Sequence, residues 1–230
     1  MERQGGPTDR RTIPRPLDPG RTITVVSGMP RSGTSMMMQM LAAAGLPIAT
    51  DGRRGADEDN PRGYYELADV KAIRDDASFL ADLVGRVVKI VAPLLPFLPD
   101  EYDYRVIFME RDLVEVLASQ RAMLARLAGS ADPADDEAMA RAFRNQLRRV
   151  KQWLAERQNV ATRLVSHHDV VTSPVETALG VMAFLAETGA FDGKIGSDEE
   201  TQRRRAVCRR MAAAVDSALY RQRRGNTPST

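Results

Sequence analysis

The chain has 230 residues, 43% of them hydrophobic, and a formal net charge of +2, which is enough material for one sizeable hydrophobic core. The near-neutral charge argues against a dedicated nucleic-acid-binding protein, and no apolar stretch is as long as an integral membrane segment. The single cysteine, Cys208, excludes an intramolecular disulfide and fits a cytoplasmic location.

The first twenty residues differ in pattern from the rest of the chain. Residues 1–20 hold glycine, proline and charged side chains without periodicity, so we expect a flexible N-terminal arm followed by a single domain over residues 21–230. Apolar runs predict buried strands at residues 22–28, 86–92, 104–110 and 161–167. Helices are predicted at residues 34–44, 112–127, 136–157, 174–187 and 197–214, with one or two more within residues 64–83.

Strands that alternate with helices predict parallel βαβ units with helices packed on a sheet. We therefore expect an α/β fold, namely a P-loop-type three-layer αβα arrangement with a central parallel sheet of about four to five strands. Ligands of such sheets bind beyond the carboxyl ends of the strands. The loops that follow the predicted strands are therefore the candidate site.

The loop after the first strand, GMPRSGTS, has the glycine spacing G-x-x-x-x-G of a phosphate-binding loop, at Gly28 and Gly33. Glycines let backbone N–H groups turn inward, and the following helix adds the positive end of its dipole. Thr34 stands where nucleotide-hydrolysing families place a lysine, and Arg31 lies inside the loop instead. This pattern predicts an anion held without an obligatory metal. The residues expected to hold it are Pro30, Arg31, Ser32, Gly33, Thr34 and Ser35.

PRSGTS resembles the loop by which the sulfotransferase superfamily holds the 5′-phosphosulfate of 3′-phosphoadenosine 5′-phosphosulfate (PAPS). Two further stretches resemble the same family. VIFMERDLVEVLASQ supplies Arg111 and Ser119 at the spacing of the arginine and serine that bind the 3′-phosphate. VVKIVAPLLPFLP resembles the lysine-bearing strand of the cytosolic enzymes, with Lys89 as the lysine, but Val91 stands where those enzymes have a histidine. The resemblance covers most of residues 22–174.

The resemblance implies catalytic roles for two cations and one carboxylate. Arg31 and Lys89 would stabilise the charge that develops on the leaving group, while an acceptor hydroxyl must lose its proton to a base. A gapless alignment with protein-tyrosine sulfotransferases places Asp51 at their catalytic glutamate, and Glu66 is the second candidate. Further acidic rivals lie between them: Asp57, Glu58 and Asp59.

Other contacts are also implied by resemblance. The NPRGYYE segment resembles a stretch of many short bacterial sulfotransferases, and three of its residues are candidates to line the acceptor pocket: Asn60, Tyr64 and Tyr65. His167 falls on a tyrosine that lies near the adenine in the family, which implies a contact with the nucleotide base. The tail SALYRQRRG resembles the arginine-bearing segment that closes over the nucleotide, which implies Tyr220 and Arg221 as contacts.

These matches imply a PAPS-dependent sulfotransferase that transfers a sulfonyl group to a hydroxyl or amine and releases adenosine 3′,5′-bisphosphate. The acceptor would be a small molecule, a lipid or a glycan, and we expect neither a metal nor a nucleic-acid partner. Two alternatives stay open: a small P-loop kinase that uses Mg-ATP, and a non-catalytic nucleotide-binding protein of the same fold. Against the kinase stand Thr34 and the lack of an aspartate at the end of an apolar strand, where the sequence has Glu110.

Overall fold

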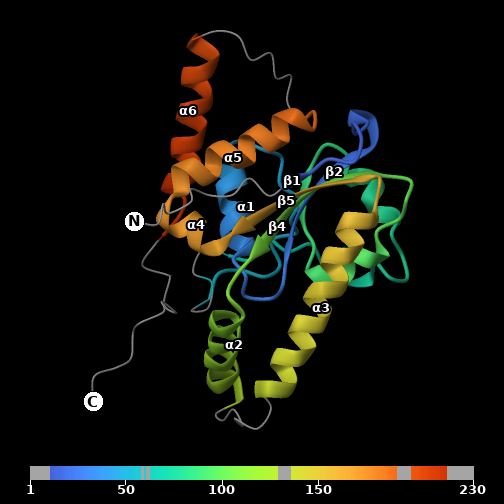
Figure 1. The fold of residues 1–230 in the computed structure, drawn as a ribbon, viewed down its shortest axis with the longest axis vertical. Helices are drawn as coiled ribbons and strands as arrows, with labels where there is room; N and C mark the ends of the chain where they lie inside the picture. The colour runs from blue at the N-terminus through green and yellow to red at the C-terminus, as the bar shows by residue number, and fades with distance from the viewer. Residues whose placement is uncertain (1–10, 58–59, 61–62, 129–135, 191–197, 217–230) are drawn as a thin grey trace, which may run out of the picture.

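The computed structural model describes residues 11–57, 60, 63–128, 136–190 and 198–216, and these form an α/β fold around a five-stranded sheet (Figure 1). The strands are β1 (Arg11–Thr12), β2 (Thr22–Gly28), β3 (Val87–Lys89), β4 (Asp103–Glu110) and β5 (Val160–Ser166). The α-helices are α1 (Thr34–Ala43), α2 (Leu113–Ala128), α3 (Asp136–Glu156), α4 (His167–Thr172), α5 (Pro174–Glu187) and α6 (Asp198–Ala213). Short 3₁₀ helices are η1 (Pro19–Arg21), η2 (Ala68–Ala72), η3 (Ser78–Leu83) and η4 (Ala92–Phe97).

The strands lie in the order β1-β5-β4-β2-β3. The four strands predicted from the sequence are present and pair in parallel, although β3 is shorter than expected. β1 was not predicted, and it pairs antiparallel with β5, with Arg11 opposite Arg163. The sheet is therefore mixed, and the expectation of a purely parallel sheet is wrong at this edge.

Residues 11–20, expected to belong to a flexible arm, pack along the sheet instead. Leu17 is buried, and the carboxylate of Asp103 accepts hydrogen bonds from Arg15 Nη2 at 2.5 Å and from the backbone N–H of Asp18 at 2.8 Å. Arg21 Nη2 donates to the same carboxylate at 3.0 Å. Asp103 is fully buried, so its charge needs these donors, which fasten the segment to the start of β4.

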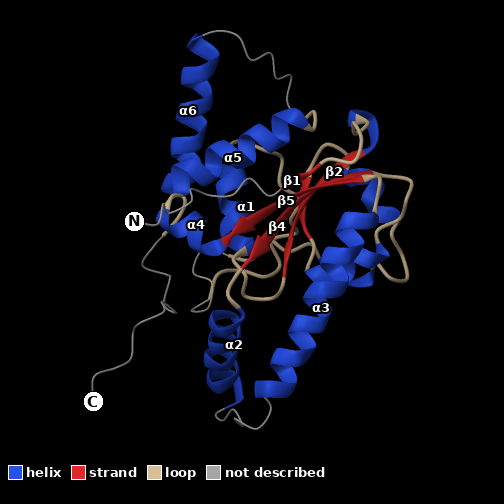
Figure 2. Cartoon of the chain, in the orientation of Figure 1, coloured by secondary structure: helices blue, strands red, loops and turns tan. Residues whose placement is uncertain are grey.

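The sheet separates two apolar cores because side chains alternate between its faces. Val26 and Ile107 face the core that contains α1, α5 and α6, whereas Val25 and Val106 face the core that contains α3 and the 3₁₀ segments. Figure 2 shows the strands between α1 and α5 on one side and α3 on the other. Both cores continue to the carboxyl edge of the sheet, where the candidate site lies.

Residues 64–83 form the 3₁₀ helices η2 and η3, not the one or two helices that we expected. The buried apolar residues come in pairs three positions apart, Val70 with Ile73 and Leu80 with Leu83. This spacing suits the three residues per turn of a 3₁₀ helix. A polar turn separates the pairs, because the carboxylate of Asp76 accepts the N–H of Ser78 at 2.9 Å.

Candidate functional site

The loop between β2 and α1 turns tightly at the carboxyl edge of the sheet. The N–H of Ser32 donates to the carbonyl oxygen of Met29 at 3.1 Å, and the N–H of Met37 donates to that of Gly33 at 3.1 Å, so the loop leads directly into the helix. The first N–H groups of a helix lack partners within it, and the positive end of the helix dipole lies at the same place. Such a loop can bind an anion.

Two positions of this loop require glycine. Gly33 has a φ of +97°, and a Cβ there would lie 2.7 Å from Cδ2 of His167. A Cβ at Gly28 would clash with Oγ of Ser32 and lie 2.7 Å from the carbonyl oxygen of Met109. Both glycines therefore let neighbouring groups approach the loop closely.

The structure brings together three residues that the sequence assigned to the nucleotide. Nη1 of Arg111 donates to the carbonyl oxygen of Arg31 at 3.1 Å, and Nε of Arg31 donates to Oγ of Ser119 at 2.9 Å. Arg31 has a φ of +69°, a left-handed conformation that is uncommon for a residue other than glycine. The loop, the end of β4 and α2 are therefore joined by side-chain hydrogen bonds.

Glu115 is a member of this group that sequence reasoning missed. Its carboxylate pairs with Nε of Arg111 at 3.0 Å, and the two side chains are only 10% and 9% exposed. The signal was present in the sequence, since charged residues four positions apart at a helix start are neighbours. The pair orients the Arg111 guanidinium toward the loop.

His167 also borders the loop, but it does not end the strand predicted at residues 161–167, because β5 stops at Ser166. It opens α4, whose N-cap residue Ser166 accepts the N–H of Asp169 at 3.3 Å. Burial, then the charges of Arg111 and His168, lower the pKa of His167 to about 3. The imidazole at the loop is therefore neutral near pH 7, and its contact with a nucleotide base stays a prediction.

Lys89 ends β3 and lies beside the start of α1. Its Nζ donates to the carbonyl oxygen of Tyr64 at 2.5 Å and lies 3.4 Å from both Ser35 Oγ and Glu66 Oε1. The Lys89 side chain is only 6% exposed, and this burial lowers its pKa, although the charge of Glu66 acts in the opposite direction. A cation and a carboxylate thus meet at the helix that follows the loop.

Asp51, expected to be the base, is engaged by the backbone. Its Oδ1 accepts the N–H of Arg53 at 2.9 Å, and its Oδ2 accepts that of Ala68, the first residue of η2, at 2.8 Å. These hydrogen bonds, that of Arg53 first, lower the pKa of Asp51. Each oxygen thus has a backbone donor, and the carboxylate ties its own loop to the start of η2.

The remaining acidic and aromatic candidates interact mainly with one another. The hydroxyl of Tyr64 donates to the carboxylate of Asp57, with 2.8 Å to each oxygen. The guanidinium of Arg54 lies 3.5 Å from the centre of the Tyr64 ring and pairs with Glu66 at 3.1 Å. Nδ2 of Asn60 donates to a backbone carbonyl nearby, and Tyr65 has a φ of +53°. Four candidates lie outside the described residues: Glu58, Asp59, Tyr220 and Arg221.

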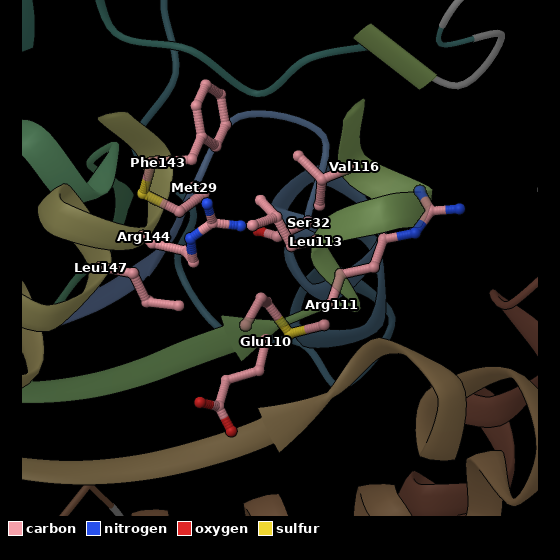
Figure 3. A pocket seen from close by; sticks show the side chains of 10 residues that line it. Met29, Ser32, Glu110, Arg111, Leu113, Val116, Phe143, Arg144 and Leu147 are labelled. Atoms are coloured by element: carbon pink, nitrogen blue, oxygen red, sulfur yellow. The ribbon is translucent and has the colours of Figure 1, made fainter. Parts of the chain in front are cut away.

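A pocket of about 70 Å³ opens between the loop, the end of β4, α2 and α3 (Figure 3). Its lining is Met29, Ser32, Met109, Glu110, Arg111, Leu113, Val116, Phe143, Arg144 and Leu147. Sequence reasoning did not find it, because the α3 residues that close it are far from the loop along the chain. Phe143 and Leu147 could be recognised only as one apolar face of a helix.

The sequence matches no protein-family model and finds no match among curated proteins. Within the described ranges, no group of three or more histidine, cysteine, aspartate or glutamate side chains could hold a metal ion. Nor does any helix in that part of the chain combine the length and apolarity needed to cross a bilayer. The site itself is therefore the basis for a functional assignment.

Proposed function

We propose that the protein is a PAPS-dependent sulfotransferase with a P-loop-type three-layer αβα fold. The observation that carries the proposal is that Arg111 and Ser119 both bond to Arg31. The sequence resemblance assigns the first two residues to the 3′-phosphate and Arg31 to the phosphosulfate loop. Their proximity supports a single nucleotide site made from stretches that are far apart in sequence.

In the proposed site, the backbone N–H groups of residues 31–35 bind the 5′-phosphosulfate. Arg111 and Ser119 bind the 3′-phosphate, for which the planar, two-pronged guanidinium is well suited. Neutral His167, packed beside Gly33, lies toward the base. Thr34 in place of a lysine fits an anion with fewer negative charges beyond its first phosphate.

The proposed reaction exchanges one bond to sulfur for another. The acceptor oxygen or nitrogen forms a bond to sulfur while the bridging S–O bond of PAPS breaks, and the bonding electrons leave with adenosine 3′,5′-bisphosphate. Arg31 and Lys89 stabilise the negative charge on the leaving oxygen. Because the sulfonyl group carries a single negative charge, the proposal includes no metal.

We assign the acceptor proton to Glu66 in preference to Asp51. A base must lie within hydrogen-bond reach of the proton that it removes. Glu66 Oε1 pairs with Arg54 at 3.1 Å and lies 3.4 Å from Nζ of Lys89, and Oε2 has no partner among the described residues. In Asp51, by contrast, both oxygens accept backbone hydrogen bonds. The Glu66 carboxylate is also 26% exposed, so an incoming acceptor can reach it.

Calorimetric titration with adenosine 3′,5′-bisphosphate in the absence of metal, beside titration with Mg-ATP, tests the proposal. We expect micromolar or tighter binding of the bisphosphate by the wild type. Arg111→Ala should weaken it about 10- to 100-fold, as expected for loss of a charged hydrogen bond. Arg149→Ala, which removes an exposed arginine of α3, is the matched control and should bind normally.

Preference for Mg-ATP, with Arg111→Ala and Arg149→Ala behaving alike, would favour the kinase alternative. Failure of both nucleotides to bind folded protein would contradict any nucleotide site at this loop. Tight bisphosphate binding without release of sulfate or sulfated product from PAPS would favour the non-catalytic alternative. Thermal unfolding of each variant verifies that lost binding does not reflect lost structure.

A further inference from the structure

The pocket between the loop, α2 and α3 shares Ser32 and Arg111 with the proposed nucleotide site, but the rest of its lining has no role in the proposed transfer. Its walls are mainly apolar, with Met29, Val116, Phe143 and Leu147 among them. An engineered cavity of about 150 Å³ admits benzene, so a pocket of about 70 Å³ has room for a smaller apolar group, such as part of an alkyl chain.

A buried hydroxyl faces this apolar space. Ser32 is 1% exposed, and its Oγ has no hydrogen-bond partner among the described residues. A buried hydroxyl without a partner destabilises the fold by about 1–3 kcal/mol. Ser32 lines the pocket, so a ligand bound there could supply the missing partner.

A guanidinium that has no partner among the described residues lies at the same pocket. Figure 3 shows the Arg144 side chain directed toward Ser32, whereas the side chains of Arg111 and Glu110 turn away. Arg144 makes no hydrogen bond or ion pair with any residue that the structure describes. Glu110, the acidic residue of the lining, pairs with Lys151, so it does not neutralise Arg144.

Two neighbouring cations of α3 are already engaged. Nη1 of Arg141 pairs with Glu137 at 2.7 Å, and Arg148 donates to the side chain of Asn145. Arg144 is the α3 cation that lines the pocket, so it is the one placed to bind an anionic ligand there.

We propose that the pocket binds a small organic carboxylate with an alkyl chain. The carboxylate pairs with Arg144, whose fork of N–H donors matches its two oxygens, and accepts a hydrogen bond from Ser32 Oγ. The chain fills the space beside Met29, Val116 and Leu147. The site adjoins the proposed nucleotide site, with which it shares the lining residues Ser32 and Arg111, but carboxylate binding does not depend on the proposed transfer reaction.

Ligand-observed NMR titration of the full chain with three probes tests this site. Hexanoate has both the chain and the charge, and we expect a Kd below about 1 mM. Hexan-1-ol keeps the chain without the charge, and acetate keeps the charge without the chain. Each should bind at least about tenfold more weakly than hexanoate.

Arg144→Gln should lower the affinity for hexanoate about tenfold and leave that for hexan-1-ol unchanged. Arg148→Gln, one turn further along the same exposed surface of α3, is the matched control and should bind hexanoate like the wild type. Because both arginines are exposed, neither substitution should disturb folding, and thermal unfolding verifies this.

The proposal is overturned if hexanoate shows no saturable binding, or if hexan-1-ol binds as tightly. Equal losses in Arg144→Gln and Arg148→Gln would overturn it as well, because they would indicate general attraction to a basic helix. The bisphosphate titration is run on the same samples, so failure at this pocket and failure at the nucleotide site are separately visible.

Discussion

The Nε atom of Arg31 donates a hydrogen bond of 2.9 Å to Oγ of Ser119 and thereby joins the loop to α2. Arg111 precedes α2, and Ser119 lies eight residues further along the chain; at the rise of a helix this spacing corresponds to about 12 Å. Arg31 bridges that gap, since its carbonyl accepts from Arg111 while its side chain reaches Ser119. A nucleotide bound at the loop would contact a preassembled group.

Ser119→Ala should weaken binding of adenosine 3′,5′-bisphosphate about tenfold, measured by calorimetry. The substitution removes both a polar contact and the group that holds the Arg31 side chain. The double variant Arg31→Gln with Ser119→Ala should therefore bind more weakly than Arg31→Gln alone, but by less than the sum of the two single losses. Strictly additive losses would show that the hydrogen bond between these residues has no part in binding.

Glu66→Gln should slow hydrolysis of PAPS to sulfate about 100-fold, because it removes the proposed proton acceptor, while bisphosphate binding persists. Asp51→Asn should keep most of the rate but unfold at a lower temperature, because one backbone N–H loses its acceptor at Oδ1 or Oδ2. Release of radiolabelled sulfate and thermal unfolding measure the two effects. A large loss of rate in Asp51→Asn, with the rate of Glu66→Gln unchanged, would instead identify Asp51 as the base.

His167 should make the fold sensitive to acid. Its pKa is about 3 in the folded chain and about 6.5 in the unfolded chain, so below pH 6.5 only the unfolded chain takes up the proton. Stability therefore falls as the pH drops toward 3, and this residue should account for about 2 kcal/mol between pH 7 and pH 5.

Urea unfolding of two histidine variants at pH 7 and pH 5 isolates this contribution. His167→Gln should lose less stability on acidification than the wild type. His168→Gln, which changes the exposed neighbour, should lose as much as the wild type. The same pH dependence in both variants would argue against a neutral buried imidazole at position 167.

Gly33→Ala should abolish bisphosphate binding, whereas Gly45→Ala should not. Both glycines have positive φ, +97° and +89°, but a Cβ at Gly45 has no atom within 4 Å, while one at Gly33 lies 2.7 Å from His167. Gly45→Ala should therefore cost about 1 kcal/mol of folding free energy for its backbone conformation alone. Urea unfolding measures the stability of the two variants, and calorimetry measures their affinity for the bisphosphate. Equal losses of affinity would contradict a tight approach of His167 to the loop.

Many of the central strands and helices could be predicted from the local pattern of apolar residues, glycine and proline in the sequence. β2 and β4 are continuous apolar runs because both of their faces are buried. The spacing of Gly28 and Gly33 was readable because it matches a known phosphate-binding pattern, although Met109 and His167, which a Cβ at these positions would meet, are distant in sequence. α5 begins at Pro174, as predicted, since proline suits the first position of a helix.

Other features depend on partners far along the chain. β1 has only two residues and is defined by its pairing with β5. Two residues are too few for the sequence pattern to predict a strand. The engagement of Asp51 requires the N–H of Ala68, which alignment to a family cannot reveal. The pocket likewise arises where α3 lies beside the loop, and the lack of a partner for the Arg144 guanidinium among the described residues becomes visible only in the folded chain.

The antiparallel pairing of β1 bears on self-association. Without β1, the outer backbone groups of β5 would form an open edge, and open edges act as templates for strands of other molecules. Arg11 and Thr12 occupy the positions opposite Arg163 and Thr162, and they place a very short, charged strand at the boundary. In a chain without β1, the free edge of β5 could pair with the same edge of a second copy. Pairing with Arg11 and Thr12 therefore protects β5 from edge-to-edge aggregation.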